Sequence, residues 1–360
     1  MKHVKKYSCN TLYRFLIICF LPVFMLVGCG TTDSGEPINL EGSWNFAGLE
    51  GIEIYVLEPD GDELLIGTEE GLFFFEENSI NFLGLTDYGI RGAVRTGDQS
   101  LLVGVNRVDA DHPAFFRRQS ESTGWEPFQN NYGGEDNINF VYRLESAGQL
   151  SDTLFTRGCV ARSYNGGKSW DSLSDTWNCS STGLPVLLFI DSFHPGHIWM
   201  GGVTGISQVY LFKSDTYGET WTNVTYGLSD NVEAVAYDVI THPDNSDRVL
   251  AGLGGAVAAS NKMMKSTDGG QSWTTALEQT GIHTFAHSLQ KPSLIYASGR
   301  DASTKLFFAW TDDFGETWEK QIFEEGPDIV TTNDMAVMTI DGDEVLFFGT
   351  DQGLFRFVID

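Results

Sequence analysis

Short apolar segments follow polar turns at regular intervals through most of the chain. Each turn contains Gly, Pro or Asp. The seven turns are Pro59-Asp60-Gly61, Gly97-Asp98, Ala147-Gly148, His194-Pro195-Gly196, His242-Pro243-Asp244, Lys291-Pro292 and Asp341-Gly342-Asp343. The apolar segments after them end at Ile66, Val103, Phe155, Met200, Ala251, Ala297 and Phe348. This pattern predicts seven β-strands spaced about 47 residues apart, which is typical of repeated four-stranded sheets.

An eight-residue motif recurs between these strands. It reads Ser-Thr-Asp-Gly-Gly-Gln-Ser-Trp over 266–273, and further copies span 163–170, 214–221 and 311–318. The shared positions are Ser163, Asn165, Gly167, Trp170, Ser214, Gly218, Trp221, Ser266, Asp268, Gly270, Trp273, Thr311, Asp313, Gly315 and Trp318. The four Trp residues recur every 45–50 residues or so, which indicates an array of identical supersecondary units.

Every position of the motif has a role in folding. An Asp or Asn at the third position accepts hydrogen bonds from backbone N–H groups that follow it, and Gly at the fifth adopts a positive φ. The final Trp is expected to be buried against a neighbouring unit. Thr216 occupies the third position of one copy, where it could not replace a catalytic acid. We therefore interpret Asp268 and Asp313 as turn residues.

The motif resembles the Asp-box, or bacterial neuraminidase repeat, of sialidases, sortilin-type receptors, xyloglucanase-type glycosidases and photosystem II assembly-factor propellers. The resemblance implies β-propeller blades and no particular chemistry. We expect an all-β, seven-bladed β-propeller of four-stranded antiparallel blades over 41–360. The last unit is one strand short, and Gly42-Ser43-Trp44 resembles the end of a motif copy. The strand around Trp44 is therefore expected to complete the last blade and close the ring.

The N-terminal segment predicts export. Four basic residues come first: Lys2, Lys5, Lys6 and Arg14. The apolar run 15–28 is too short to span a bilayer. It ends in Leu26-Val27-Gly28-Cys29, which resembles a bacterial lipobox. The resemblance implies a lipoprotein signal peptide over 1–28, lipidation of Cys29 and a flexible tether over 29–40. An ordinary signal peptide with an incidental Cys is the alternative.

These features predict an exported, lipid-anchored protein of the bacterial cell envelope, at the outer membrane or facing the periplasm. In such an oxidising compartment Cys159 and Cys179 are candidates for a disulfide, with two free thiols as the alternative. The chain carries 49 acidic and 22 basic residues, a net charge of −27. Because such a surface repels phosphates, we expect no nucleic-acid partner. We also expect no cofactor, no metal and a monomer.

Strand direction predicts where a ligand would bind. In a four-stranded blade, the motif turns lie at one end, and the inter-blade connections lie at the other. Polar residues at that second end are the default site of a propeller. The candidate ligand-binding residues are Tyr88, Arg91, Arg107, Asp109, Asp136, Asn137, Asp230, Asn231, His283, Arg300, Asp301 and Asp328.

Two functions follow from this reading. The first is a non-catalytic propeller that binds a protein or a glycan, and the alternative is a sialidase-like or xyloglucanase-like glycoside hydrolase. Tyr142-Arg143-Leu144-Glu145 lacks the Pro of the sialidase arginine motif, and Asp136 and Asp328 could form a carboxylate pair. Three arginines converging on one carboxylate, or two carboxylates about 5–10 Å apart, would favour the hydrolase.

Overall fold

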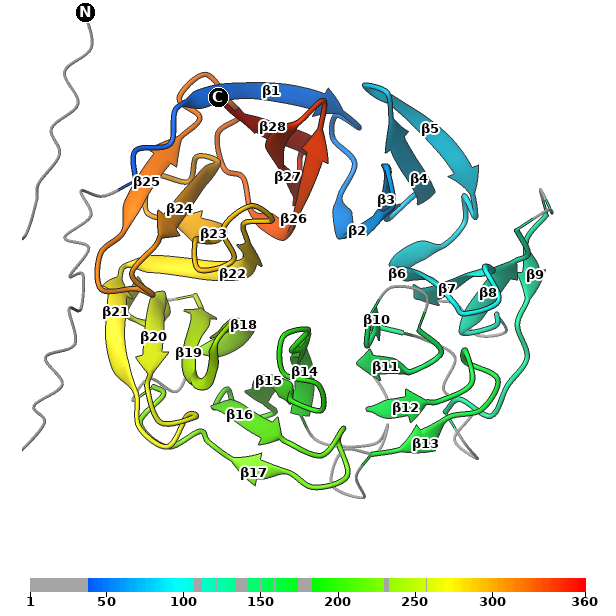
Figure 1. Ribbon diagram of the computed structural model, residues 1–360, viewed down its shortest axis with the longest axis horizontal. Helices are drawn as coiled ribbons and strands as arrows, with labels where there is room; N and C mark the ends of the chain where they lie inside the picture. Colours follow the sequence, from blue (N-terminus) through cyan, green and yellow to red (C-terminus); the bar gives the residue numbers. More distant parts are fainter. Residues whose placement is uncertain are drawn as a thin grey trace, which may run out of the picture. The chain divides into compact units, whose positions relative to one another are not determined.

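Seven four-stranded antiparallel sheets surround a central axis in the computed structural model (Figure 1). The structure describes residues 38–106, 112–120, 122, 124–133, 141–148, 151–157, 160–173, 183–229, 233–256 and 258–360. Within these ranges the helix η3 (Ala258–Ser260) spans a single turn, and no helix is long and apolar enough to cross a membrane. The predicted seven-bladed β-propeller is confirmed.

The chain forms the blades in order, and each blade begins at its innermost strand. Blade 1 contains β2 (Ile54–Asp60), β3 (Glu63–Thr68), β4 (Gly71–Glu76) and β5 (Ser79–Gly84); blade 2 contains β6 (Gly89–Arg95), β7 (Leu101–Asn106), β8 (Phe115–Arg118) and β9 (Glu126–Pro127). Blade 3 contains β10 (Arg143–Ser146), β11 (Leu154–Arg157), β12 (Ala161–Ser163) and β13 (Asp171–Ser172); blade 4 contains β14 (Gly183–Ile190), β15 (Ile198–Thr204), β16 (Val209–Ser214) and β17 (Thr222–Asn223).

The remaining blades follow the same plan. Blade 5 contains β18 (Val235–His242), β19 (Asn245–Gly254), β20 (Lys262–Ser266) and β21 (Thr274–Glu278); blade 6 contains β22 (Thr280–His287), β23 (Ile295–Asp301), β24 (Phe307–Thr311) and β25 (Glu319–Ile322). Blade 7 contains β26 (Thr332–Ile340), β27 (Asp343–Thr350), β28 (Gly353–Ile359) and β1 (Gly42–Gly48).

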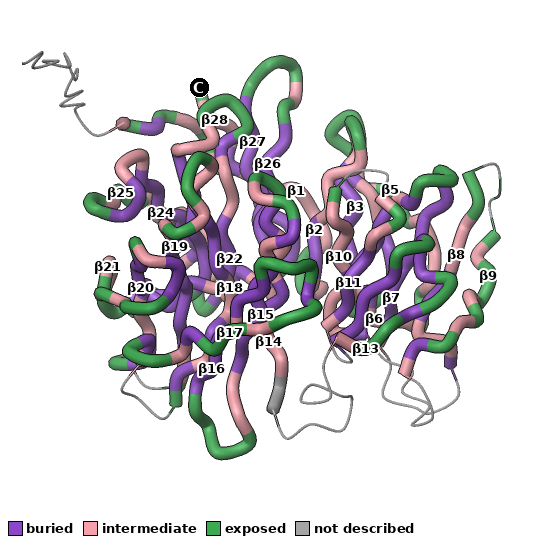
Figure 2. Tube along the Cα trace, turned by 60° about the horizontal axis from the view of Figure 1, so that its bottom comes forward, coloured by how far each residue is buried: buried purple, intermediate pink, exposed green. Residues whose placement is uncertain are grey.

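The seven predicted apolar strands are the second strands of the blades, from β3 to β27. They are apolar on both faces because each blade is packed between two others. One core cluster, for example, joins Ile66 of blade 1 to Phe347 of blade 7. Figure 2 shows buried residues along the strands and exposed residues in the turns. The hydrophobic core is therefore divided into layers between neighbouring blades.

Strand β1 closes the ring, as predicted. It pairs antiparallel with β28, and Trp44 lies opposite Phe357. The Trp44 indole stacks on Phe323 of blade 6 with ring centroids 5.4 Å apart and an interplanar angle of 6°. Pairing the first strand with the last occupies the edge that blade 7 would otherwise expose. The two ends of the propeller are thereby held in one sheet.

The motif turns form one hydrogen-bond pattern. In the copy over 266–273, the Gly270 N–H donates to Ser266 Oγ (2.8 Å), and the Ser272 N–H donates to Asp268 Oδ1 (2.8 Å). Gly270 has φ +89°. The copies over 163–170 and 311–318 make equivalent bonds. Asn165, Asp268 and Asp313 therefore serve as hydrogen-bond acceptors within their turns.

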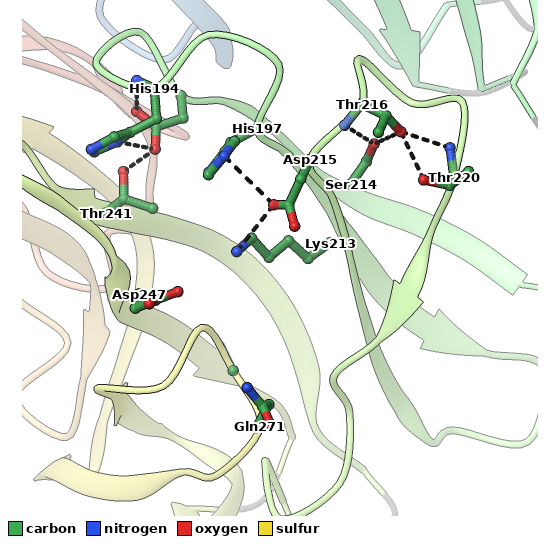
Figure 3. A network of polar contacts seen from close by, with 12 residues as sticks. His194, His197, Lys213, Ser214, Asp215, Thr216, Thr220, Thr241, Asp247 and Gln271 are labelled. Atoms are coloured by element: carbon green, nitrogen blue, oxygen red, sulfur yellow. Dashed lines mark hydrogen bonds and ion pairs between the residues drawn. The ribbon is translucent and has the colours of Figure 1, made fainter.

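Threonine takes the place of Asp in the copy over 214–221 without changing the turn. The Thr220 N–H donates to Thr216 Oγ1 (2.9 Å) (Figure 3). The Gly218 N–H donates to Ser214 Oγ (2.8 Å). A hydroxyl oxygen is thus a sufficient acceptor at the third position. This explains why the turn does not require a carboxylate.

The motif Trp residues occupy equivalent places around the ring, each directly before the fourth strand of its blade. Trp170 stacks on Phe115 of blade 2 at 5.2 Å, and Trp273 Nε1 donates to the Val224 carbonyl at the end of blade 4 (2.9 Å). Each of these two indoles therefore packs against the preceding blade, as Trp44 does.

The remaining predictions about the N-terminal segment and the cysteines lie outside the described residues. They concern Cys29, Cys159, Cys179 and the segment 1–37.

Candidate functional site

The inner strands share one irregularity near their first residues. A β-bulge interrupts the pairing of six of them with their second strands. The bulged residues are Tyr55, Arg91, Val186, Tyr237, His283 and Asn333. In blade 3, Tyr142 directly precedes β10 at the matching place. A bulge redirects its side chain, and here all seven side chains line one central cavity.

The cavity has a volume of about 230 Å³. Its lining comprises Glu53, Tyr55, Arg91, Tyr142, Arg143, Arg157, Val186, Leu188, Tyr237, Asp238, His283, Thr284, Asn333 and Asp334. All but Val186 and Leu188 have polar side chains. Because most of these residues lie at the beginnings of the inner strands, the cavity and the motif turns are at opposite ends of the blades, as the strand directions require.

Arg143 of β10 connects blades across the ring. Its Nη1 atom lies 2.9 Å from Asp334 Oδ2 of β26, and its Nε atom forms an ion pair with Glu145. Burial opposes the charge of Arg143, but Asp334 and Glu145 outweigh burial and raise its pKa. The positive charge of this arginine is therefore already balanced by the protein.

Two carboxyl groups in the cavity hold neighbouring blades together. Asp238 and Asp334 occupy equivalent positions, directly after the bulge. Asp238 Oδ2 accepts the Phe285 N–H of the next blade (2.8 Å), and Asp334 Oδ2 accepts the Leu57 N–H of the next blade (2.9 Å). Burial raises the pKa of Asp238 to about 8. Asp238 is therefore mostly protonated at neutral pH and adds little negative charge to the cavity.

Arg91 and Arg157 have no ion pair with any described carboxylate. The Arg91 guanidinium stacks on the Tyr55 ring, with Cζ 3.4 Å from the centroid, and Arg157 Nη2 donates to the Tyr142 carbonyl (3.0 Å). The Nε atoms of both are buried without a hydrogen-bond partner. Burial lowers the pKa of Arg91. The pKa of Arg157 is lowered to about 9, mainly by burial and also by the positive charges of Arg143 and Arg91.

An aromatic pair forms the opposite wall. Tyr237 and His283 are stacked with ring centroids 4.1 Å apart and an interplanar angle of 28°. Burial lowers the pKa of His283 to about 4, so the imidazole is neutral at pH 7. Its Nδ1 lies 3.2 Å from the Thr332 carbonyl, to which it donates. The wall therefore offers ring surface and polar edges without a charge.

The structure brings two of the sequence-predicted candidates, Arg91 and His283, into the cavity. Tyr88 packs edge-on against Phe116 of its own blade and is not part of the lining. Arg300 is exposed and also lies outside the lining. The other described candidates are the acids of blade 6.

Both acids of blade 6 have local structural partners. Asp301 is buried, accepts the Ser303 N–H (2.9 Å) and pairs with Lys320 (2.6 Å). Asp328 is exposed and pairs with Lys305 (2.6 Å). A carboxylate pair between Asp136 and Asp328 is not described, because Asp136 lies outside the described residues. The same holds for Arg107, Asp109, Asn137, Asp230 and Asn231.

Sequence reasoning missed most of the cavity lining. It considered polar residues in the loops, whereas most of the lining residues lie at the beginnings of the inner strands. A signal was present: Tyr142-Arg143, Tyr237-Asp238 and Asn333-Asp334 are polar pairs at the starts of otherwise apolar segments. Superposing the seven units by their apolar strands would have aligned them.

His194 and His197 belong to a second group of polar side chains, and their ring centroids are 5.7 Å apart. His194 Nδ1 lies 2.8 Å from Asp191 Oδ2, whereas His197 Nε2 lies 3.7 Å from Asp215 Oδ1 (Figure 3). Asp191 also accepts the Thr241 hydroxyl of blade 5 (2.6 Å). Each imidazole thus has its own carboxylate. Among the described side chains, no group of three or more His, Cys, Asp or Glu could hold a metal.

No family model and no curated protein sequence matches the chain. Solved structures do. They include YCF48 bound to D1 peptide (TM-score 0.64, 13% identity, 91% of this chain and 96% of that one). They also include streptogramin B lyase (0.61, 10%, 88% and 98%) and the GH74 xyloglucanase from Xanthomonas campestris (0.61, 14%, 88% and 53%). The chain spans about half the length of the GH74 structures. At these identities the similarity shows the fold alone, a seven-bladed β-propeller.

Proposed function

We propose that this chain is a lipid-anchored binding protein of the bacterial cell envelope, built on an Asp-box β-propeller. Its central cavity holds a protein or glycan ligand without catalysing a reaction. One observation carries the proposal: seven equivalent side chains, one from the start of each inner strand, converge on a cavity lined almost entirely by polar groups. Polar groups converging in a concave site are the usual mark of ligand recognition.

The use of the carboxyl groups supports binding over catalysis. Asp238 and Asp334 each accept a backbone N–H from the next blade, and Asp334 also pairs with Arg143. Glu53 accepts from Asn333 Nδ2 (3.3 Å). Acid–base catalysis requires a carboxyl group that can exchange a proton with the substrate. Here Asp238 and Asp334 are engaged in holding the blades in place.

A glycoside hydrolase remains the second candidate, because one observation favours it. Arg91, Arg143 and Arg157 line the same cavity as Glu53 and Asp238. A carboxyl group with its pKa raised to about 8 by burial, as at Asp238, has the protonation state of a general acid. Of these three arginines, only Arg91 is among the candidate residues predicted from the sequence.

The test is to block the cavity without removing a polar group. Full-length protein in detergent is applied to glycan and peptide arrays, as wild type and as Val186→Trp. The indole would occupy the cavity and reduce the affinity for the ligand by about tenfold or more. The matched control is Ile206→Trp, at an exposed position between β15 and β16 on the same end of the ring. Equal binding by Val186→Trp and wild type would contradict the proposal.

The same preparations distinguish the second candidate. Hydrolysis of fluorogenic sialosides and β-glucans by wild type, abolished by Val186→Trp, would establish a hydrolase. Ligand binding without turnover would support the binding protein.

A further inference from the structure

We infer that Arg91 and Arg157 form an anion-binding end of the cavity that takes the carboxylate of an acidic sugar. The inference rests on the proposed function and specifies its ligand. It begins from the balance of charges in the cavity. Arg143 is matched by Asp334 and Glu145, but Arg91 and Arg157 have no ion pair with any carboxylate among the described residues.

A buried guanidinium without a counter-charge is costly. Removing a charge from water is offset only by a paired charge and by complete hydrogen bonding. Arg157 receives neither, because its Nη2 atom is bonded to a carbonyl and its Nε atom has no partner. A bound anion would supply the missing counter-charge.

The geometry of Arg91 leaves its edge for a ligand. Its flat face is held against the Tyr55 ring, and its Nε atom is buried without a partner. A guanidinium fixed by stacking presents its N–H groups in one plane, an arrangement that suits the two oxygens of a carboxylate. Stacking therefore orients Arg91 without pairing its charge with a carboxylate.

The rest of the lining favours a sugar ring over an apolar peptide side chain. Hydroxyl and amide groups dominate it, from Tyr55, Tyr142, Tyr237, Thr284 and Asn333. The volume of about 230 Å³ lies below the usual range of about 300–1,000 Å³ for drug-sized ligands, so one ring-sized group fits. Glu53 in the same cavity disfavours a dianion such as phosphate more than a monoanion, since like charges repel.

The overall charge of the protein further restricts which anionic ligands can bind. The net charge of −27 repels polyanions from the whole surface. A single acidic residue at the end of an otherwise neutral glycan meets less repulsion than a chain of acidic sugars. The fitting ligand is therefore a glycan with one terminal sugar acid.

The experiment measures binding of methyl glucuronide, methyl glucoside, inorganic phosphate and a short peptide, with free or amidated C-terminus, to full-length protein in detergent. Calorimetry is done on wild type, Arg157→Gln, Val186→Trp and the control Arg300→Gln, an exposed arginine outside the lining. We expect the glucuronide to bind at least tenfold or so more tightly than the glucoside, since charge-assisted hydrogen bonds contribute that much. Arg157→Gln should abolish this preference, and Arg300→Gln should retain it.

Each contrary outcome has one meaning. Equal binding of glucuronide and glucoside, or no binding of the acid at millimolar concentration, would overturn the inference and leave cavity binding itself in place. Preference for phosphate or for the free peptide C-terminus, lost in Arg157→Gln, would overturn the sugar-acid assignment. Glucuronide binding that Val186→Trp leaves intact would instead contradict the proposed function. A circular dichroism spectrum and melting temperature equal to those of wild type would show that Arg157→Gln is folded.

Discussion

Single residues in this propeller act mainly by satisfying backbone groups. The third position of the motif accepts from the N–H four residues on, whether it is Asp268, Asn165 or Thr216. The fifth position must combine a positive φ with close packing. A Cβ added to Gly270 would lie 3.0 Å from Val224 and 3.2 Å from Trp273. The motif is therefore explained residue by residue as a turn.

Replacing Gly270 by Ala tests this explanation. A side chain at φ +89° is strained, and its methyl group would meet the neighbouring blade. We expect the free energy of unfolding to fall by about 2–3 kcal/mol, measured by urea denaturation.

The matched control is Gly61→Ala, at φ +68° with no atom near the added Cβ. Only the backbone strain remains there, so a loss of about 1 kcal/mol is expected. Equal losses at the two positions would show that contact with the preceding blade contributes nothing.

The ionisation of Asp238 should affect how the free energy of unfolding depends on pH. Its pKa is raised to about 8 in the folded protein, whereas an unfolded Asp ionises near about 3.9. The folded state thus binds more protons between these values. The contribution of Asp238 to stability is therefore fully present below about pH 4 and is lost as pH rises toward about 8, by at most about 1.4 kcal/mol per pH unit.

Asp238→Asn should remove that contribution. The amide loses one backbone acceptor, which lowers stability by a constant amount, but it cannot ionise. We expect a shallower decline of unfolding free energy between about pH 5 and 8 than in wild type, whereas Asp328→Asn, at an exposed acid, should leave the wild-type slope. An unchanged slope in Asp238→Asn would mean that Asp238 ionises normally.

At the scale of elements, the β-bulges of the inner strands and the pairing of β1 with blade 7 determine the architecture. The bulges turn the first residues of the inner strands toward the axis, while the residues after them bond to the next blade. Strand β1 carries the N-terminal part of the propeller to the C-terminal blade. Trp44 on this strand contacts Phe308, Phe323, Phe348 and Phe357.

Trp44→Ala should weaken the closure of the ring. The variant leaves a cavity among these phenylalanines, and we expect a loss of about 3 kcal/mol in unfolding free energy and a lower melting temperature.

Phe46→Ala is the matched control on the same strand, because Phe46 is 47% exposed. The Phe46→Ala substitution should lower the free energy of unfolding by about 0.5–1 kcal/mol. If the two variants were equally stable, β1 would not hold the ring together through its indole.

At the scale of the whole molecule, an acidic ring has a cavity whose arginines are not all neutralised. The net charge of −27, together with Arg91 and Arg157, which form no ion pair with a described carboxylate, favours small, weakly charged ligands. The proposed lipid anchor would keep the ring beside the envelope, where glycans are displayed. In this proposal the lipid on Cys29 anchors the protein, and the cavity of the propeller binds the ligand.

Cys29→Ser tests the anchor. Without the thiol the acyl chains cannot be attached, and each buried methylene contributes about 0.8 kcal/mol to membrane binding. We expect the wild type in the membrane fraction and in the detergent phase of a phase-separation assay, with incorporation of labelled fatty acid. The variant should lack the label and leave the detergent phase.

Cys159→Ser serves as the control, because it removes a thiol from within the propeller segment. Fatty-acid labelling that persists in Cys29→Ser would refute the lipobox assignment.

The sequence by itself determined the fold because its information is periodic. Seven apolar strands and four copies of the motif repeat at the blade spacing, and each repeat packs mainly on its neighbours, so local patterns are sufficient. Even the closing strand could be predicted, because Trp44 ends a fragment of the same motif. The turn roles of Asp268 and Gly270 followed from backbone chemistry alone.

Only the tertiary structure decided which side chains meet at the centre. The cavity residues come from all seven blades, and the ion pair between Arg143 and Asp334 joins positions 191 residues apart. Which arginine obtains a carboxylate and which does not depends on where the closed ring places the inner strands, six of which are also shifted by a bulge. No local sequence pattern shows which arginines pair with carboxylates, because these pairs form only when the ring closes.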